Sequence, residues 1–302
     1  MPDFWKNKKL IVVTGPTAVG KTSVAIALAR YFGAEIVSAD SRQFFKELNI
    51  GTAKPDDTEL AAAPHHFINS HSIHDDYDAA QFGNDALKLI HALFDRFDYV
   101  VLCGGSGLYI KAVLEGFDEI PAIDSGVRRE IMALYEAQGI SWLQAQMKEN
   151  DPEYYATLDQ QNPHRLIRAL EVKKGTGFSI AAFRKNNILQ HPFGVVKIGL
   201  ELPREVLYQR IDERMDEMIA QGLFNEAENL YPFKDHNALQ TVGYKEIFDF
   251  LDGAYSKEEA IRLLKRNSRR YAKRQLTWFK RDTETTWFNP GDVNAIVRWI
   301  GK

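Results

Sequence analysis

Apolar positions in the first part of the chain follow two different periods. Short apolar runs typical of buried strands lie at residues 10–14, 35–38, 66–68 and 99–102. Segments 23–30 and 108–114 instead carry apolar side chains at helical spacing, each soon after one of these strands. Strands that alternate with helices in this way predict an α/β fold with a parallel sheet.

The pattern changes to a helical one between residues 118 and 193. The helices that it predicts, joined in part by Asp-Pro and Asn-Pro turns, span 127–138, 141–149, 163–173 and 179–186. An apolar run at 195–202 then predicts a strand that returns to the sheet. We therefore expect a core built from residues 1–117 and 194–302, interrupted by an all-helical subdomain at 118–193.

Composition excludes several classes of protein. The 302 residues are 45% hydrophobic and 26% charged, as is ordinary for a soluble globular chain. We find no apolar stretch long enough to span a bilayer and no signal peptide, and we expect a cytoplasmic protein without a membrane partner. A single cysteine, Cys103, excludes an internal disulfide. The net charge of −3 means that any nucleic-acid partner needs a local basic patch.

Residues 15–22 form a complete G-x-x-x-x-G-K-T phosphate-binding motif between a strand and a helix. The residues are Gly15, Pro16, Thr17, Ala18, Val19, Gly20, Lys21 and Thr22. Glycines let backbone N–H groups approach phosphate oxygens, and the helix N-terminus adds partial positive charge. Lys21 is expected to reach the terminal phosphates and the Thr22 hydroxyl to ligate Mg²⁺. The motif predicts a P-loop NTPase-like core that binds a di- or triphosphate.

The acidic partner of this loop is less clear from the pattern. The strand at 99–102 ends in Cys103 and two glycines rather than in a carboxylate, which argues against an ordinary nucleotide hydrolase. Asp40 follows the strand at 35–38, at the sheet edge where ligands bind. It could bind Mg²⁺ or accept a proton, or it could cap the segment that follows it. The spacing does not decide between these roles.

The segment 261–281 is strongly basic. It holds nine Lys or Arg residues and no acid, and its apolar positions form one stripe at helical spacing. A surface that carries only positive charge and lies near aromatic residues favours the binding of a polyanion such as RNA. A helix that is merely solvated usually mixes both signs of charge. The four histidines in 65–74 (His65, His66, His71 and His74) lack Cys or acidic partners at zinc-site spacing, so we expect His65 and His66 to shape the core or a pocket edge.

Taken together, the motifs resemble those of the tRNA dimethylallyltransferases, also called IPP transferases. The matching blocks, in chain order, are 15–22, 38–43, 49–55, 64–66, 104–109, 162–165, 168–172, 210–214, 241–246 and 271–279. A phosphate loop is common to many families, but G-T-A-K-P at 51–55 and V-G-Y-K-E at 242–246, in this order, are specific. The resemblance covers nearly the whole chain.

The resemblance implies transfer of a dimethylallyl group from its diphosphate to the exocyclic amine of the adenosine 3′ to the anticodon. It assigns Asp40 as the general base and Arg214 as a second diphosphate contact beside the loop with Lys21 and Thr22. Mg²⁺ is the implied cofactor, and tRNA and dimethylallyl diphosphate are the implied partners. No obligate protein partner is evident.

The resemblance also implies which residues meet tRNA through its anticodon stem-loop. They are Asp40, Ser41, Arg42, Gln43, Ser106, Arg128, Gln161, Asn162, Pro163, His164, Arg165, Gln240, Thr241, Val242, Gly243, Tyr244, Lys245, Lys273 and Arg274. The helical insertion would clasp the stem, and the target base would leave its stack to react. A small-molecule kinase and an adenine-nucleotide prenyltransferase are the alternatives, and neither needs a large RNA surface. A protein that only binds RNA is a third.

Overall fold

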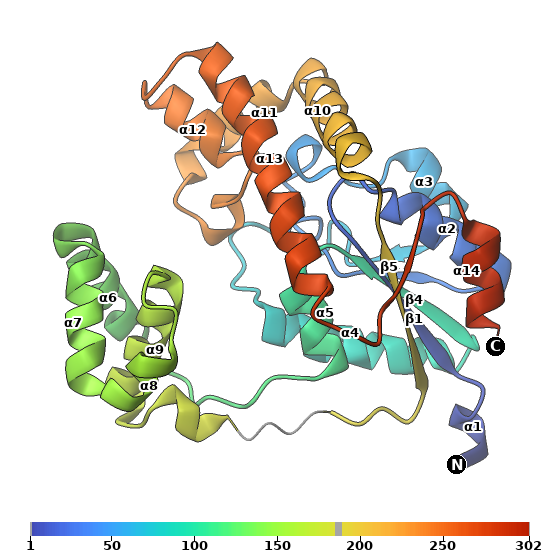
Figure 1. Ribbon diagram of the computed structural model, residues 1–302, viewed down its shortest axis with the longest axis horizontal. Helices are drawn as coiled ribbons and strands as arrows, with labels where there is room; N and C mark the ends of the chain where they lie inside the picture. Colours follow the sequence, from blue (N-terminus) through green and yellow to red (C-terminus); the bar gives the residue numbers. More distant parts are fainter. Residues whose placement is uncertain (1, 185–188, 302) are drawn as a thin grey trace. The chain divides into compact units, whose positions relative to one another are not determined.

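A computed structural model describes residues 2–184 and 189–301 (Figure 1). It divides the chain into two compact units. The first combines Met1–Gly116 with Gln190–Lys302, and the second is Phe117–Leu189. The sequence pattern placed the helical insertion at 118–193. Each unit is described by itself.

A six-stranded parallel sheet forms the centre of the first unit. Its strands are β1 (Lys9–Thr14), β2 (Ile36–Ser38), β3 (His65–His66), β4 (Tyr99–Gly104), β5 (Gly194–Leu200) and β6 (Thr286–Phe288). They lie in the order β3-β2-β4-β1-β5-β6, and every pair is parallel. The predicted α/β class and parallel sheet are confirmed. The sequence pattern did not reveal β6, because three half-buried residues leave too little periodicity to recognise.

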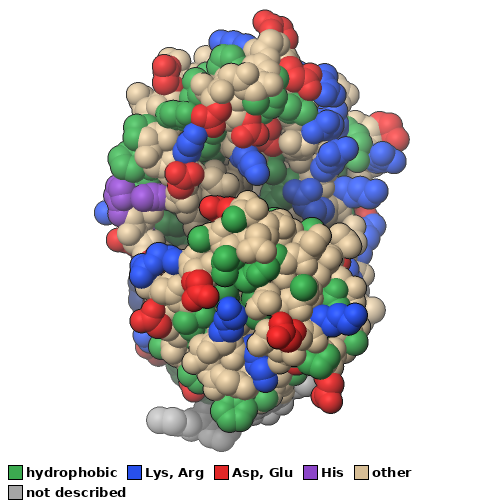
Figure 2. Space-filling view, turned by 90° about the vertical axis from the view of Figure 1, so that its left-hand side faces the viewer, with side chains coloured by type: hydrophobic (Ala, Val, Ile, Leu, Met, Phe, Trp, Pro, Cys, Tyr) green, Lys and Arg blue, Asp and Glu red, His purple; other side chains and the backbone are tan. Residues whose placement is uncertain are grey.

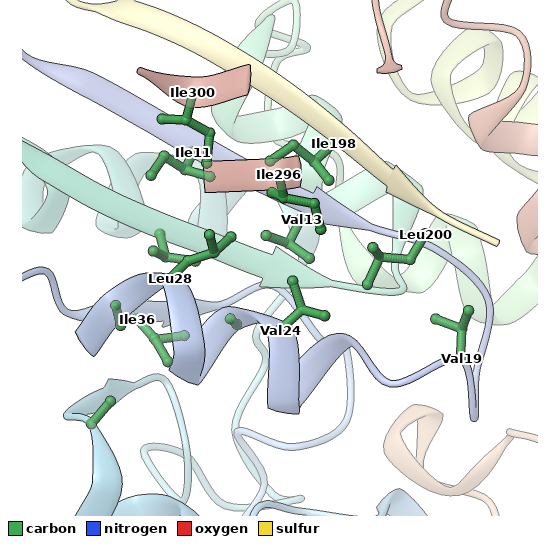
Figure 3. Close-up of a cluster of buried hydrophobic side chains, with 14 of the residues drawn as sticks. Ile11, Val13, Val19, Val24, Leu28, Ile36, Ile198, Leu200, Ile296 and Ile300 are labelled. Carbon is green, nitrogen blue, oxygen red and sulfur yellow. The ribbon is translucent and has the colours of Figure 1, made fainter. Parts of the chain in front are cut away.

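Helices cover both faces of this sheet. On one face α2 (Lys21–Phe32) and α14 (Val293–Ile300) pack on β1, β4 and β5, as the cluster around Ile11, Val13 and Ile198 shows (Figure 3). On the other face α4 (Ala79–Phe94) and α5 (Gly107–Leu114) cover Leu10, Val12 and Leu102. Successive residues of β1 therefore point to opposite, equally buried faces, which explains the uninterrupted apolar run.

The first unit contains further helices and short 3₁₀ turns. They are α1 (Pro2–Trp5), η1 (Ile50–Thr52), α3 (Asp57–Ala62), α10 (Arg204–Ala220), α11 (Leu223–Leu230), η3 (Tyr231–Phe233), η4 (Asn237–Leu239), α12 (Lys245–Leu251) and α13 (Lys257–Phe279). The 23-residue α13 joins three separate cores. Leu264 packs in the cluster of α10, α11 and α12, Ala272 in the α2 layer and Phe279 in the α4 layer.

The second unit is helical. It contains α6 (Ser125–Gln138), α7 (Ile140–Asn150), α8 (Pro152–Thr157), α9 (Pro163–Thr176) and η2 (Ile180–Phe183). Its core includes Ile131, Leu143, Met147, Leu166 and Leu170. The helix predicted at 179–186 is only a short 3₁₀ turn as far as Phe183, and 185–188 lie outside the described residues. No helix in the described ranges 2–184 and 189–301 is long and apolar enough to cross a membrane.

Candidate functional site

The carboxyl ends of three neighbouring strands bring the predicted site residues of the core together. β2, β4 and β1 lie side by side and parallel, so the segments that follow them leave the same edge of the sheet. These segments carry Asp40 after β2, Ser106 after β4 and loop 15–20 after β1. From β1 the chain continues to β2, which lies on one side of β1 in the sheet, and it later enters β5 on the other side of β1. In open α/β sheets, ligands bind where the chain connections change sides in this way.

The loop 15–20 has the backbone geometry that its glycines allow. Gly15 has a φ of 149°, and a Cβ there would lie 2.8 Å from the Leu200 carbonyl oxygen. Gly20 has a φ of 105° and precedes α2 without a side-chain cap. The first N–H groups of α2 have no carbonyl partner within the helix. The N-terminus of α2 is therefore suited to an anion.

Cations converge on this helix terminus. The Lys21 ammonium donates to the carbonyl oxygens of Gly15 at 3.1 Å and Pro16 at 2.8 Å. Arg214 of α10 reaches the Thr17 hydroxyl at 3.4 Å, and Arg210, one turn earlier, reaches the Val19 carbonyl oxygen at 3.4 Å. Both contacts are long, so the two guanidinium groups remain available to a ligand.

Burial makes this positive charge costly. It lowers the pKa of Lys21 from 10.5 to about 8, and repulsion from Arg214 acts in the same direction. Burial also lowers the pKa of Arg214 and of Arg42, and the Arg42 Nε is buried without a hydrogen-bond partner among the described residues. Asp40 is the carboxylate that attracts all three cations. Glu217 and Glu59 also attract Arg214, but burial still lowers the pKa of all three cations, so the site favours an anionic ligand.

Asp40 has the capping role that its sequence position suggested, and it also lines the space beside the loop 15–20. Its Oδ1 accepts hydrogen bonds from the backbone N–H groups of Arg42 at 2.9 Å and Gln43 at 3.3 Å, so it caps the turn after β2. Its Oδ2 has no hydrogen-bond partner among the described residues. The side chain is half-buried and lines the clefts at this edge of the sheet. Capping thus fixes the carboxylate and leaves one oxygen for a ligand.

Ser106 ties the segment after β4 to the segment after β2. Its hydroxyl accepts the Ser41 N–H at 3.0 Å and donates to the Ser41 hydroxyl at 3.0 Å. It lies 9% exposed at the start of α5. Ser106 therefore holds Ser41 beside Asp40.

Two connected hollows lie over these residues. The larger, of about 900 Å³, is lined by Lys21, Thr22 and Arg210. The smaller, of about 110 Å³, is lined by Arg42 and by Thr241, Val242 and Gly243. Both are also lined by Thr17, Ala18, Asp40, Thr52, Arg214, Met218 and Tyr271. The structure thus places the loop, Asp40 and Arg214 around one space.

The block 240–245 is divided between surface and core. Gln240 and Lys245 are exposed, whereas Tyr244 is 0% exposed. The Tyr244 hydroxyl donates to Glu226 at 2.6 Å. The prediction that Tyr244 meets RNA therefore does not fit its side chain in this structure, because the ring packs in the core instead.

Most of the predicted RNA-contacting residues of the second unit lie at the start of α9. Asn162 caps this helix, Pro163 is its first residue, and Gln161, His164 and Arg165 are exposed. Arg128 of α6 is exposed and pairs with Glu171 at 3.1 Å. Residues 161–165 are therefore consecutive at the start of α9, whereas Arg128 is tied to a residue further along this helix.

Sequence reasoning missed two polar residues that organise the site. Glu226 of α11 accepts hydrogen bonds from the N–H groups of Asn49, Ile50 and Gly51, at 2.8–3.1 Å, and thereby holds the G-T-A-K-P block. Gln275 of α13 bonds both Thr17 and Gly105. Glu226 lies in none of the matching blocks. Gln275 lies within the block 271–279, and it continues the apolar stripe of α13, where a polar residue signals a buried partner, but the sequence analysis assigned it no role.

The basic surface of α13 is smaller than its sequence suggests. Four of the nine basic residues in the segment 261–281 have acidic partners from outside this segment: Arg262 with Glu259, Lys265 with Asp216, Arg269 with Asp212 and Lys280 with Glu201. In the described chain no ion pair involves Arg266, Arg270, Lys273, Arg274 or Arg281. Lys and Arg side chains gather along one edge of the face drawn in Figure 2, whereas both signs of charge mix elsewhere on it.

Comparison with known proteins agrees with these features. The model of the IPP transferase family matches residues 43–282, and the chain belongs to this family. It is 49% identical over 294 residues to the tRNA dimethylallyltransferase of Cytophaga hutchinsonii, covering 97% of each chain. A similar relative, from Christiangramia forsetii, is 52% identical over 279 residues and 92% of each chain.

Solved structures give the same family. The full-length tRNA isopentenylpyrophosphate transferase of Bacillus halodurans superposes with a TM-score of 0.72 at 39% identity, over 97% of this chain and 96% of that one. A eukaryotic dimethylallyltransferase acting on tRNA superposes with a TM-score of 0.74 at 25% identity, over 95% and 75%.

Proposed function

We propose that this protein is a prenyltransferase that moves a dimethylallyl group from dimethylallyl diphosphate to the N6 amine of adenosine 37 in tRNA, with release of diphosphate. One observation carries the proposal. Residues of the segment 15–22, which we call the anion cradle, line one space together with Arg210, Arg214 and the carboxylate of Asp40. Membership of a family whose relatives are named for this reaction supports it.

The diphosphate is the leaving group, so the site must stabilise the charge that develops on it. The residues 15–22 would hold it through the N-terminus of α2, with Lys21 and Arg214 on its oxygens. The desolvated cations favour this role, since a bound diphosphate supplies the negative charge that they lack. The same cradle would then serve a departing diphosphate rather than a transferred phosphoryl group.

Asp40 would act as general base on the adenine. As the N6 nitrogen bonds to C1 of the prenyl group, the bond between C1 and the diphosphate oxygen breaks. The nitrogen must then lose one proton, for which Oδ2 of Asp40 is free while Oδ1 remains bonded to the turn. A positioned carboxylate also orients the amine, which is a weak nucleophile.

Mg²⁺ fits the site if it arrives with the diphosphate. No group of three or more His, Cys, Asp or Glu within the described residues could hold a metal by itself. The Thr22 hydroxyl and the Asp40 carboxylate both line the larger hollow, and such sparse oxygen ligands suit an ion that keeps waters and phosphates. When bound, the ion would neutralise diphosphate charge.

The tRNA would be held by residues of both units. Ser41, Arg42, Gln43, Ser106 and 241–243 would surround the extruded base, and Lys273, Arg274, Gln240 and Lys245 would meet backbone phosphates. In the second unit Arg128 and 161–165 would contact the anticodon stem-loop. The exposed positions among them suit phosphate contacts.

Asp40→Asn tests the chemistry directly. The purified protein is incubated with dimethylallyl diphosphate, Mg²⁺ and unmodified tRNA, and the mass of the nucleoside at position 37 is measured. We expect the wild type to add one prenyl unit and the variant to lose at least 100-fold in kcat with tRNA affinity within threefold, because the amide cannot take the proton. Glu47→Gln, a carboxylate outside the hollows, is the control.

Two results would count against the proposal. Prenyl transfer by Asp40→Asn at the wild-type rate would remove Asp40 as the base. Consumption of ATP without a prenylated nucleoside would favour a kinase instead.

A further inference from the structure

Gln275 occupies an unusual place on the basic helix α13. It is 7% exposed, whereas its neighbours Lys273 and Arg274 are exposed. Its Oε1 accepts the N–H of Thr17 at 2.8 Å, and its Nε2 donates to the carbonyl oxygen of Gly105 at 2.9 Å. One amide therefore bridges the loop after β1 and the segment after β4.

The two hydrogen bonds of Gln275 fix the loop 15–20, whose glycines allow its backbone several conformations. Gly15 needs a positive φ, so hydrogen bonds rather than backbone preference must hold the loop that follows. Thr17 is held at its N–H by Gln275 and contacts Arg214 through its hydroxyl. With its N–H committed to Gln275, Thr17 leaves the anion to the N-terminus of α2 and to Lys21.

The fit around the amide is close. A Cβ on Gly105 would lie 2.5 Å from Nε2 of Gln275 and 3.5 Å from the Lys21 nitrogen. Glycine at 105 thus makes room for the amide beside Lys21. The next residue, Ser106, holds Ser41 beside Asp40, so a shift of Gly105 would reach the carboxylate as well.

We propose that Gln275 is a positioning residue for the diphosphate cradle, and that it aligns the loop with the segment that supports Asp40. The inference rests on the proposed function for its substrate, but the cradle can be tested without prenyl donor or RNA. The probe is inorganic pyrophosphate with Mg²⁺, titrated by calorimetry.

Gln275→Met keeps the size of the side chain and removes both hydrogen bonds. We expect the Kd for pyrophosphate to rise about tenfold, since a buried N–H and a buried carbonyl lose their partners. Gly105→Ala, which displaces the unaltered amide, is expected to give a similar loss, and the double variant less than the sum of the two. Gln209→Met, at an exposed glutamine of α10, is the control and should bind as the wild type does. An unchanged Kd in Gln275→Met would overturn the proposal.

Gln275→Glu separates positioning from packing. A protonated carboxyl can accept from Thr17 and donate to Gly105, as the amide does, whereas the carboxylate cannot donate and repels diphosphate. The pyrophosphate affinity relative to wild type should therefore recover as the pH falls. A ratio that stays constant with pH would overturn the proposal even if Gln275→Met failed to fold.

Steady-state kinetics provides a second readout. With full substrates, Gln275→Met should raise KM for dimethylallyl diphosphate and lower kcat, with KM for tRNA within twofold. Equal rises in both KM values would indicate a general loss of structure and overturn a positioning role. A wild type that binds pyrophosphate but transfers no prenyl group would overturn the proposed function and leave this inference standing.

Discussion

At the scale of single residues, the site is defined by buried positive charge. Lys21, Arg42 and Arg214 are desolvated around Asp40, and burial lowers the pKa of each of these cations. Folding positions these charges before any ligand arrives. Such preorganisation reduces the reorganisation needed when a leaving group becomes charged.

The Lys21 ammonium should make pyrophosphate binding dependent on pH. Its pKa of about 8 means that the side chain is mostly charged below pH 8 and mostly neutral above it. Because an anion binds the charged form, affinity should fall as the pH rises from 7 to 9. Binding near pH 8 should take up a proton, which calorimetry in two buffers of different ionisation enthalpy measures.

Lys21→Arg is the matched control, since a guanidinium stays charged throughout this range. Its affinity should vary less between pH 7 and 9. A wild-type affinity that did not change with pH would show that another group holds the anion.

At the scale of elements, two blocks far apart in sequence form one structural unit. The carboxylate of Glu226 in α11 caps η1 through three N–H groups and also accepts from Tyr244. Gly51 has no side chain because a Cβ there would lie 2.6 Å from the Tyr244 ring. The G-T-A-K-P and V-G-Y-K-E blocks are therefore adjacent across this contact.

Glu226→Gln should lower the free energy of unfolding by about 1–3 kcal/mol, because its NH₂ group would face backbone donors. Urea denaturation measures the change. Glu228→Gln, on the same helix but exposed, should change stability by less than about 0.5 kcal/mol. Equal effects of the two substitutions would show that the hydrogen bonds of Glu226 to η1 do not stabilise the protein.

Several elements were predictable from local pattern, and others were not. The loop 15–22 and the strands β1, β4 and β5 carry strong local signals, and their prediction agrees with the structure. Glu226, Gln275 and the burial of Tyr244 depend on partners distant in sequence, which local periodicity does not encode. The counter-charges of α13 were missed for the same reason, since Asp212 and Asp216 lie on α10.

At the scale of the whole molecule, a net charge of −3 and a local basic surface must be reconciled. The ion pairs of α13 neutralise part of the helix and leave Lys273 and Arg274, near its carboxyl end, without acidic partners in the described chain. RNA phosphates can replace solvent counterions at these two positions.

Lys273→Ala with Arg274→Ala should weaken tRNA binding and reduce the slope of log K against log salt by about 1.5. Arg262→Ala with Lys265→Ala removes the same charge where acids already balance it, so its slope should change by less than about half as much. Fluorescence anisotropy at several salt concentrations measures both. Equal slopes for the first variant and the wild type would show that Lys273 and Arg274 do not contact RNA phosphates.

The bond between Thr17 and Gln275 spans 258 positions of the chain. During synthesis, the anion loop therefore emerges long before the helix that fixes it. The growing chain also lacks β5 and β6 until after the whole helical unit has been made. Domains generally fold as units during translation, so the helical unit can form first while the core waits for its second half. Catalytic competence is thus an event of the last stage of synthesis, and a chain that stops before α13 would carry the motif without the site.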